Sequence, residues 1–150
     1  MGSTLTNLLY HIVFSTKNRS PSLSGELQSH LYQYIGGIIR EKRGYLLEAG
    51  GTADHLHLLA RFPPTISISE MQQNIKGSSS GWVNREHKTD AHFGWQDGYA
   101  AFSVSPSKVP AVSRYIKNQE AHHRRTTFKV ELIKLLEKHE VEYDERYVFS

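Results

Sequence analysis

The sequence predicts an α+β fold: a four-stranded antiparallel sheet of ferredoxin-like, RRM-like split βαβ order, with helices on one face and two further helices at the C-terminus. Two observations lead to this prediction. Hydrophobic patterns follow one another as strand, helix, strand, strand, helix, strand and two more helices. The chain has 150 residues, the size of one ordinary domain, so we expect a single domain over residues 1–150.

The first half of this order contains three strands and one helix. Residues 8–16 alternate, with one face made of Leu8, Tyr10, Ile12 and Phe14 and the other of Leu9, His11, Val13 and Ser15. Apolar residues then recur at helical spacing over 24–43, and Gly44 lies where a helix C-cap belongs. Two more strands are expected at 45–49 and 55–62, the second of which is terminated by two prolines.

The second half begins with a helix that opens at Ser67. Ser67 and Glu70 have the spacing of a capping box, and the helix is expected to run toward Trp82, although the glycines and serines of 77–81 weaken its second half. The remaining elements are one strand and two helices, predicted over 98–105, 107–124 and 127–139.

The composition predicts a compact soluble protein, and we expect it to be cytoplasmic. Hydrophobic residues make up 38% of the chain, and no apolar run approaches the roughly 18 residues of a membrane span. No signal-peptide pattern is present at the N-terminus. The chain has no cysteine, so histidine, carboxylate and amide oxygen are the metal ligands to consider.

Positive charge is concentrated in the body of the chain. Residues 1–130 hold 15 of the 18 Lys and Arg residues but 9 of the 15 acidic ones, and the last 20 residues are net acidic. A basic body favours a polyanionic partner such as nucleic acid, although many solvated enzymes carry the same charge.

The third strand separates apolar from polar side chains. Leu56, Leu58, Ala60 and Phe62 point one way, and His55, His57 and Arg61 point the other way. A sheet with helices on one face leaves the second face open, and an open face with basic and aromatic groups is a platform that single-stranded nucleic acids use.

His55 and His57 are the first candidate site residues. Two residues apart on a strand, their imidazoles lie side by side on one face, which suits a shared metal ion. The bare spacing is equally compatible with a pair of surface histidines. Amidohydrolases also use His-x-His, but their barrel of about 200 residues or more exceeds this chain.

The second candidate group lies on the helix predicted over 107–124. The i,i+4 relation places Tyr115 and Gln119 on one helix face, with His122 beside them. Taken alone, Tyr115 is equally compatible with a half-buried packing residue. Cations fall on another face of this helix, where they could contact phosphates or simply be solvated; with basic residues elsewhere, the candidate DNA contacts are Lys17, Arg19, Arg61, Lys76, Arg114, Lys117, Arg124 and Arg125.

Together these motifs resemble the single-tyrosine HUH transposases of the insertion-sequence 200/605 group. The segment 54–59 is similar to their HUH strand, and Tyr115 with Gln119 is similar to their Tyr-x-x-x-Gln helix. Four further segments also resemble this family: 16–19, 73–77, 95–104 and 143–147. The likeness therefore spans nearly the whole chain.

The resemblance implies a DNA transposase that cleaves and rejoins single-stranded DNA at hairpin-bearing ends. Tyr115 would be the nucleophile, forming a 5′-phosphotyrosine and a free 3′-hydroxyl, and His55, His57 and Gln119 would hold Mg²⁺ or Mn²⁺. The ligand set alone would also admit Zn²⁺, Co²⁺ or Ni²⁺.

The family also suggests a homodimer, in which Tyr115 of one chain could face the histidines of the other. The short hinge over 103–107 permits the tyrosine helix to fold over its own sheet or across to a partner. Three alternatives stay open: a domesticated relative that processes genomic repeats, a non-catalytic single-stranded nucleic-acid-binding module, and a protein-interaction domain with incidental histidines.

Overall fold

A four-stranded sheet forms the centre of the molecule. The computed structural model describes residues 2–87 and 91–150. The sheet order is β2-β3-β1-β4, and every neighbouring pair is antiparallel, as the split βαβ pattern predicts. The strands are β1 (Leu8–Ser15), β2 (Tyr45–Gly51), β3 (His55–Phe62) and β4 (Ala100–Val104). Each strand was predicted to within two residues at either end.

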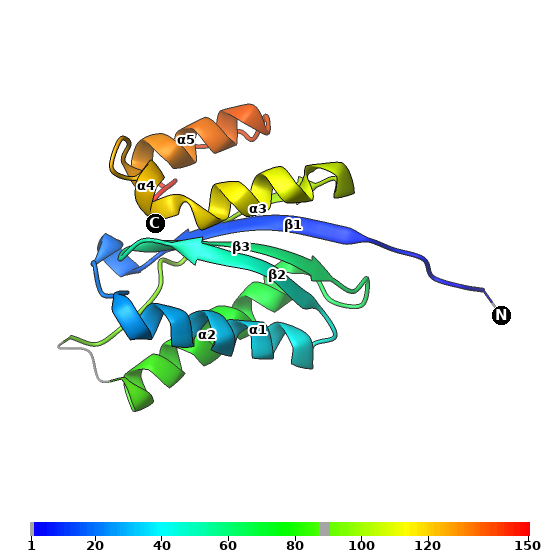
Figure 1. The fold of residues 1–150 in the computed structure, drawn as a ribbon, viewed down its shortest axis with the longest axis horizontal. Helices are drawn as coiled ribbons and strands as arrows, with labels where there is room; N and C mark the ends of the chain where they lie inside the picture. Colours follow the sequence, from blue (N-terminus) through cyan, green and yellow to red (C-terminus); the bar gives the residue numbers. More distant parts are fainter. Residues whose placement is uncertain (1, 88–90) are drawn as a thin grey trace.

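Helices α1 (Gly25–Glu41) and α2 (Ile68–Glu86) cover one face of the sheet (Figure 1). The apolar residues predicted to point inward from β3 lie in the main core with Ile12 and Phe14 of β1. The Ser67 hydroxyl accepts a hydrogen bond from the Glu70 amide at 3.0 Å, which confirms the capping box. The helix α2 runs four residues past Trp82, because burial of Ile75 and Val83 outweighs the low helix propensity of the glycines between them.

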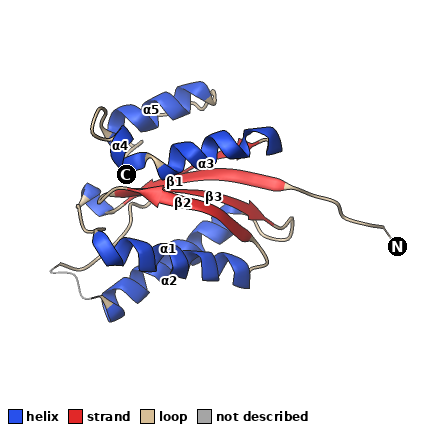
Figure 2. Cartoon of the chain, in the orientation of Figure 1, coloured by secondary structure: helices blue, strands red, loops and turns tan. Residues whose placement is uncertain are grey.

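The opposite face is covered as well, so the prediction of an open face is wrong. Helices α3 (Val109–Lys117), α4 (Gln119–His122) and α5 (Phe128–Lys138) lie over it (Figures 1 and 2). Their apolar side chains form a second core with Val13 and Phe102, contributed by Phe128, Leu132 and Leu136 of α5. The sheet is therefore the middle of three layers, and His11, His55 and His57 on this second face are buried, whereas Arg61 near the end of β3 is exposed.

The helix predicted over 107–124 is divided. A short 3₁₀ turn η2 (Pro106–Lys108) precedes α3, and Asn118 separates α3 from α4 with a backbone of φ −96° and ψ 19°. Another 3₁₀ turn, η1 (Lys17–Arg19), follows β1. The Asn118 amide still donates to the Arg114 carbonyl at 3.2 Å, so the hydrogen bonds of α3 extend to the residue that separates the two helices.

Two glycines permit close packing. Gly44 was predicted as a helix C-cap, but the residue with a left-handed backbone at the end of α1 is Arg43, with φ 68°. A glycine is needed at position 44 for another reason, because a Cβ there would lie 2.7 Å from the Arg61 carbonyl oxygen. At Gly50 of β2, a Cβ would overlap the Ile116 carbonyl. Gly50 thus allows α3 to lie directly on β2.

In the described part of the chain, no helix combines the length and apolar character needed to cross a membrane.

Candidate active site

The two histidines of β3 lie inside the protein. His55 and His57 are both fully buried, between the sheet and the C-terminal helices, and not on an exposed face as predicted. The period of two along β3 does place them side by side, with ring centroids 5.3 Å apart. Antiparallel pairing with β1 adds His11 to this face, and its Nε2 lies 2.8 Å from His57 Nδ1.

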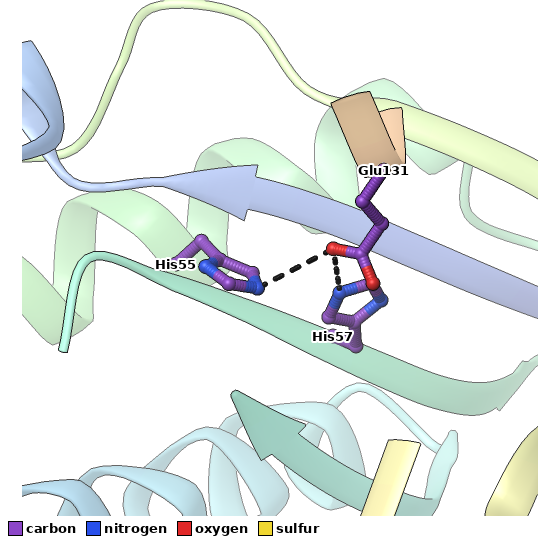
Figure 3. A group of neighbouring side chains, drawn as sticks. All are labelled: His55, His57 and Glu131. Carbon is purple, nitrogen blue, oxygen red and sulfur yellow. Dashed lines mark hydrogen bonds and ion pairs between the residues drawn. The ribbon is translucent and has the colours of Figure 1, made fainter. Parts of the chain in front are cut away.

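A buried carboxylate lies at the centre of these side chains. Glu131 extends from α5 and is 2% exposed. Its Oε1 lies 3.1 Å from His57 Nε2 and 3.5 Å from His55 Nε2. Figure 3 draws this carboxylate oxygen with dashed lines to both imidazoles. Its Oε2 accepts hydrogen bonds from the Tyr115 hydroxyl and from Gln119 Nε2, the latter at 2.8 Å.

Two more histidines approach the same carboxylate. His123 Nε2 lies 2.9 Å from Glu131 Oε1, and His122 Nε2 lies 3.4 Å from Oε2. The ring of His55 stacks on Phe128, with centroids 4.3 Å apart, so α5 closes the site from above the sheet. Residues far apart in the sequence thus converge on one polar cluster within a largely apolar layer.

The hydrogen-bond partners of His55 favour a cation between the side chains. His55 Nδ1 lies 2.9 Å from an Asp54 carboxylate oxygen, which accepts its proton and directs the lone pair to Nε2. Nε2 in turn lies 2.8 Å from Gln119 Oε1, an acceptor whose orientation is fixed because Nε2 of the same amide donates to Glu131. Two acceptors at this distance require a proton or a metal ion between them.

The spacing of these donor atoms fits a metal ligand set. Ligands about 2.1 Å from an octahedral ion lie roughly 3 Å from one another. The separations here are 2.8 Å for His55 Nε2 to Gln119 Oε1 and 3.1 Å for His57 Nε2 to Glu131 Oε1. Two imidazoles, one amide oxygen and one carboxylate oxygen suit Mn²⁺ and zinc-like ions readily and admit Mg²⁺. The residues present therefore fit a divalent metal.

Burial and charge set the protonation of the cluster. Burial lowers the pKa of the His57 imidazole. Burial, together with the neighbouring His57, lowers the pKa of His11 to about 3. Both rings are therefore neutral at neutral pH. Burial alone would raise the pKa of Glu131, but hydrogen bonds from His57, Tyr115 and Gln119 hold it well below its usual value. The carboxylate is consequently ionised at neutral pH.

Tyr115 is half-buried at the end of α3, and its hydroxyl points into the cluster. Burial raises the pKa of Tyr115 well above its usual value, and the adjacent Glu131 carboxylate raises it further. Two hollows reach the Tyr115 ring from outside: one of about 690 Å³ between α3 and α5, and one of about 550 Å³ beside α4. The phenol is thus protonated, yet approachable from two sides.

The four residues predicted for catalysis and metal binding are brought together within one chain. Tyr115 and Gln119 reach the same carboxylate although Asn118 separates their helices. The hinge over 103–107 directs α3 back over its own sheet, where it packs on β2 and β3. A single chain therefore supplies all the side chains of the predicted site.

The predicted DNA-contacting cations are dispersed. Arg124 and Arg125 line the smaller hollow beside Tyr115. Lys117 lies 3.6 Å from Glu48, and the Arg61 guanidinium lies over the Tyr45 ring on the edge strand β2.

The other cations of the predicted set do not line this hollow. Lys17 and Arg19 are in η1, Arg114 is exposed on α3, and Lys76 is on α2 across the sheet. Of the predicted set, only Arg124 and Arg125 share a hollow with Tyr115.

Sequence reasoning missed Glu131, His11 and His123. Glu131 had a detectable signal: it is an acidic residue between Phe128 and Leu132 on the apolar stripe of its helix, where a carboxylate needs buried partners. His11 had a weaker one, because its strand pairing with β3 follows from the predicted sheet order. Nothing in the local sequence marks His123.

Comparison with known proteins gives consistent matches. The profile of the family described as "Transposase IS200 like" matches residues 4–119, a span that includes Tyr115 and Gln119 and ends before Glu131. The transposase for insertion sequence element IS200 of Salmonella typhimurium is 33% identical over 129 residues, which cover 79% of this chain and 81% of that protein. The corresponding Salmonella typhi transposase matches with the same identity and coverage.

Two solved structures share the fold. A crystal structure of a candidate transposase from Deinococcus radiodurans R1 has a TM-score of 0.63 and 23% identity, covering 79% of this chain and 95% of that chain. A REP-associated tyrosine transposase bound to a REP hairpin has a TM-score of 0.62 and 14% identity, covering 82% of this chain and 72% of that chain. At these identities the likeness concerns the fold alone.

Proposed function

Because this chain belongs to the family of IS200-like transposases, we propose that it cleaves and rejoins single-stranded DNA through a covalent bond between Tyr115 and a 5′-phosphate. The observation that carries the proposal is the position of the Tyr115 hydroxyl. It lies in the same buried cluster as His55, His57 and Gln119, all from one chain.

Tyr115 is the nucleophile in this proposal. Its oxygen attacks the scissile phosphorus, the bond from phosphorus to the 3′-oxygen breaks, and that oxygen leaves as a 3′-hydroxyl after taking up a proton. Attack of the same or another 3′-hydroxyl on the phosphotyrosine restores a DNA phosphodiester and releases the phenol. Because one phosphoester replaces another, rejoining needs no external energy source.

Removal of the phenol proton is the demanding part of this step. The hydroxyl hydrogen points at Glu131 Oε2, which makes this carboxylate the nearest group to receive it. Burial and the same negative charge oppose phenolate formation in the resting protein. Mg²⁺ or Mn²⁺ would be held by His55, His57 and Gln119, with Glu131 as a further oxygen ligand; when bound, it supplies positive charge that polarises the phosphate.

The proposed ligand is single-stranded DNA that contains a hairpin. A structural neighbour of this chain is bound to a REP hairpin, and the basic body of the chain suits a polyanion. The two hollows beside Tyr115 give a strand access from either side of α3, with Arg124 and Arg125 placed for phosphate contacts in one of them.

The covalent adduct tests the proposal. A labelled hairpin oligonucleotide taken from the DNA that flanks the gene is incubated with the protein and Mn²⁺ or Mg²⁺, and the products are separated under denaturing conditions. Wild type is expected to form a protein–DNA adduct that Tyr115→Phe lacks, with DNA binding retained. Tyr147→Phe is the matched control, because Tyr147 is 65% exposed and far from the cluster in sequence. Adduct formation by Tyr115→Phe at the wild-type level would refute the assignment.

A further inference from the structure

A third hollow is lined by residues of α2 and lies away from the catalytic cluster. Helix α2 covers the face of the sheet opposite the C-terminal helices (Figure 1). It has a volume of about 520 Å³ and lies between one face of α2 and the loop that precedes β4. This volume is in the range of sites that hold a small organic molecule such as a nucleotide. None of the proposed catalytic or metal-binding residues lines this hollow.

A buried amide without a hydrogen-bond partner lies in the wall of this hollow. Gln72 is 1% exposed, and among the residues that the structure describes neither its Nε2 nor its Oε1 has a partner. Other buried polar groups around the hollow are satisfied: Trp95 Nε1 donates to Ser79 at 2.9 Å, and Gln96 Oε1 accepts from the Ser15 amide at 2.7 Å. A buried, unpaired amide costs about 1–3 kcal/mol, so its retention points to a ligand.

A cation lies next to this amide. The Lys76 ammonium donates to the Asp97 and Gly98 carbonyl oxygens, both at 2.9 Å. Within residues 2–87 and 91–150, no carboxylate oxygen lies within salt-bridge distance of it; partial burial lowers its pKa, and the nearby Asp97 carboxylate raises it in part. The ammonium also lies 5.8 Å from the centroid of the Phe14 ring. The Asp97 carboxylate, which lines the same hollow, offsets part of its charge, and the remainder can attract an anionic group such as phosphate.

An aromatic ring completes the set. Tyr99 lines the hollow and is 38% exposed, so part of its ring is free to stack on a planar group. No hydrogen bond holds the Gln72 amide, so rotation about its last side-chain bonds can present a donor and an acceptor side by side to the hollow. That pair is complementary to the edge of adenine that carries N6 and N7.

From this combination we propose that the hollow between α2 and the 95–99 loop binds one unstacked nucleotide of the DNA strand, adenine by preference. Gln72 reads the base edge, Tyr99 stacks on the base, and Lys76 contacts the phosphate. The inference rests on the proposed function only in taking DNA as the source of the nucleotide. Because α2 and the cluster around Tyr115 lie on opposite faces of the sheet, binding here is separable from cleavage.

The test measures binding without metal, so that cleavage plays no part. Fluorescence anisotropy is recorded for labelled d(A)8, d(T)8 and an eight-residue abasic oligonucleotide in EDTA. Gln72→Leu removes the amide at nearly constant volume, and Gln33→Leu is the matched control because Gln33 is exposed on α1. We expect Gln72→Leu to weaken d(A)8 binding about 5- to 100-fold, to leave the abasic ligand unchanged, and to abolish the preference of d(A)8 over d(T)8.

Thermal unfolding of the same variants separates recognition from folding. Replacing an unpaired buried amide by an apolar group of similar size is expected to keep or raise the melting temperature. Gln72→Met provides a second apolar variant with the same expectation. A lowered melting temperature for both variants would mean that Gln72 has a structural partner, and the proposal would fail.

Further outcomes decide between the sources of the ligand and between the two proposals. If dAMP binds as tightly as d(A)8, the ligand is a free nucleotide and the assignment to DNA is wrong. If Gln72→Leu binds every oligonucleotide like wild type while Tyr115-dependent adducts form, this proposal fails and the proposed function stands. If base preference is lost in Gln72→Leu but no adduct forms with any DNA, the nucleotide-binding proposal stands and the proposed function fails.

Discussion

Glu131→Gln gives the sharpest test of how the active-site cluster is held together. The substitution keeps the shape of the side chain but removes its charge and replaces one acceptor oxygen by a donor. Four donors converge on the carboxylate in the structure: Tyr115, Gln119, His57 and His123. The glutamine amide cannot accept all four hydrogen bonds. Its oxygen is an acceptor, but its NH₂ group is a donor and would lie against the donors that now bind the second carboxylate oxygen.

The size of the effect follows from these contacts. A hydrogen bond to a charged group contributes about 1.5–3 kcal/mol to stability, and a hydrogen bond between neutral groups about 0.5–1.5 kcal/mol. Replacing the charged acceptor therefore removes roughly 1 kcal/mol of stabilisation for each of the four hydrogen bonds. Four donors give an expected loss of about 3–5 kcal/mol in the free energy of unfolding. For a chain of this length, that corresponds to a fall in melting temperature of roughly 6–20 °C.

The loss should also depend on pH. Hydrogen bonds hold the pKa of Glu131 below its ordinary value of 4.5 in the folded protein. The carboxylate therefore contributes its full stability above pH 4.5, and this contribution falls as the pH drops through the lowered pKa. The difference between wild type and Glu131→Gln should be largest at pH 6–8 and should narrow below pH 4.5.

Urea unfolding of the metal-free proteins at pH 7 and pH 3.5 measures both effects. Glu137→Gln on the exposed side of α5 is the control and should stay within about 0.5 kcal/mol of wild type. The reasoning is refuted if Glu131→Gln is as stable as wild type at pH 7, or if its deficit is the same at both pH values.

Four further predictions concern packing, metal, DNA and assembly. Gly50→Ala should cost roughly 1–3 kcal/mol because its Cβ would overlap the Ile116 carbonyl, whereas Gly37→Ala, with no atom within 4 Å, should be neutral or stabilising; equal denaturation midpoints would contradict this. His55→Ala and His57→Ala should each lose Mn²⁺ binding in calorimetry, and Gln119→Ala should weaken this binding less. Because His55 and His57 are buried, their substitution should also lower the melting temperature; unchanged Mn²⁺ affinity would exclude the two histidines as ligands. DNA affinity should fall linearly with salt on a double-logarithmic plot, and Arg124→Gln with Arg125→Gln should reduce the slope by about one each; a flat response would exclude phosphate contacts. If a homodimer forms composite sites, a mixture of His57→Ala and Tyr115→Phe chains should regain cleavage; an inactive mixture of stable dimers would indicate that each chain uses its own Tyr115.

The C-terminal helices were predicted correctly in register but not in their division into two helices. The helix predicted over 107–124 has the right register, since Tyr115 and Gln119 reach the same carboxylate, but the break at Asn118 was not predicted. The i,i+4 pattern depends only on local geometry, and it holds across the break at Asn118. Both helices contact β2, and no local sequence pattern reports the tertiary contacts that accompany the break.

The exposure of the histidines was wrong for a related reason. Alternation along β3 assigns His55 and His57 to the face opposite the main core, and this assignment is confirmed. What covers that face depends on residues more than 60 positions away, which supply Phe128 and the second core. A polar face on a strand is compatible with solvent or with a buried polar cluster, and alternation alone does not distinguish them.

The sequence by itself determined the element order, the sheet faces and the grouping of the two histidines, because each of these follows from a period of two or 3.6 residues along a short segment. Only the tertiary structure decided that these histidines are buried, that one chain brings Tyr115 to them, and that Glu131 lies between them. The physical reason is separation along the chain: His57 and Glu131 are 74 positions apart, and their contact depends on how α5 packs over the sheet.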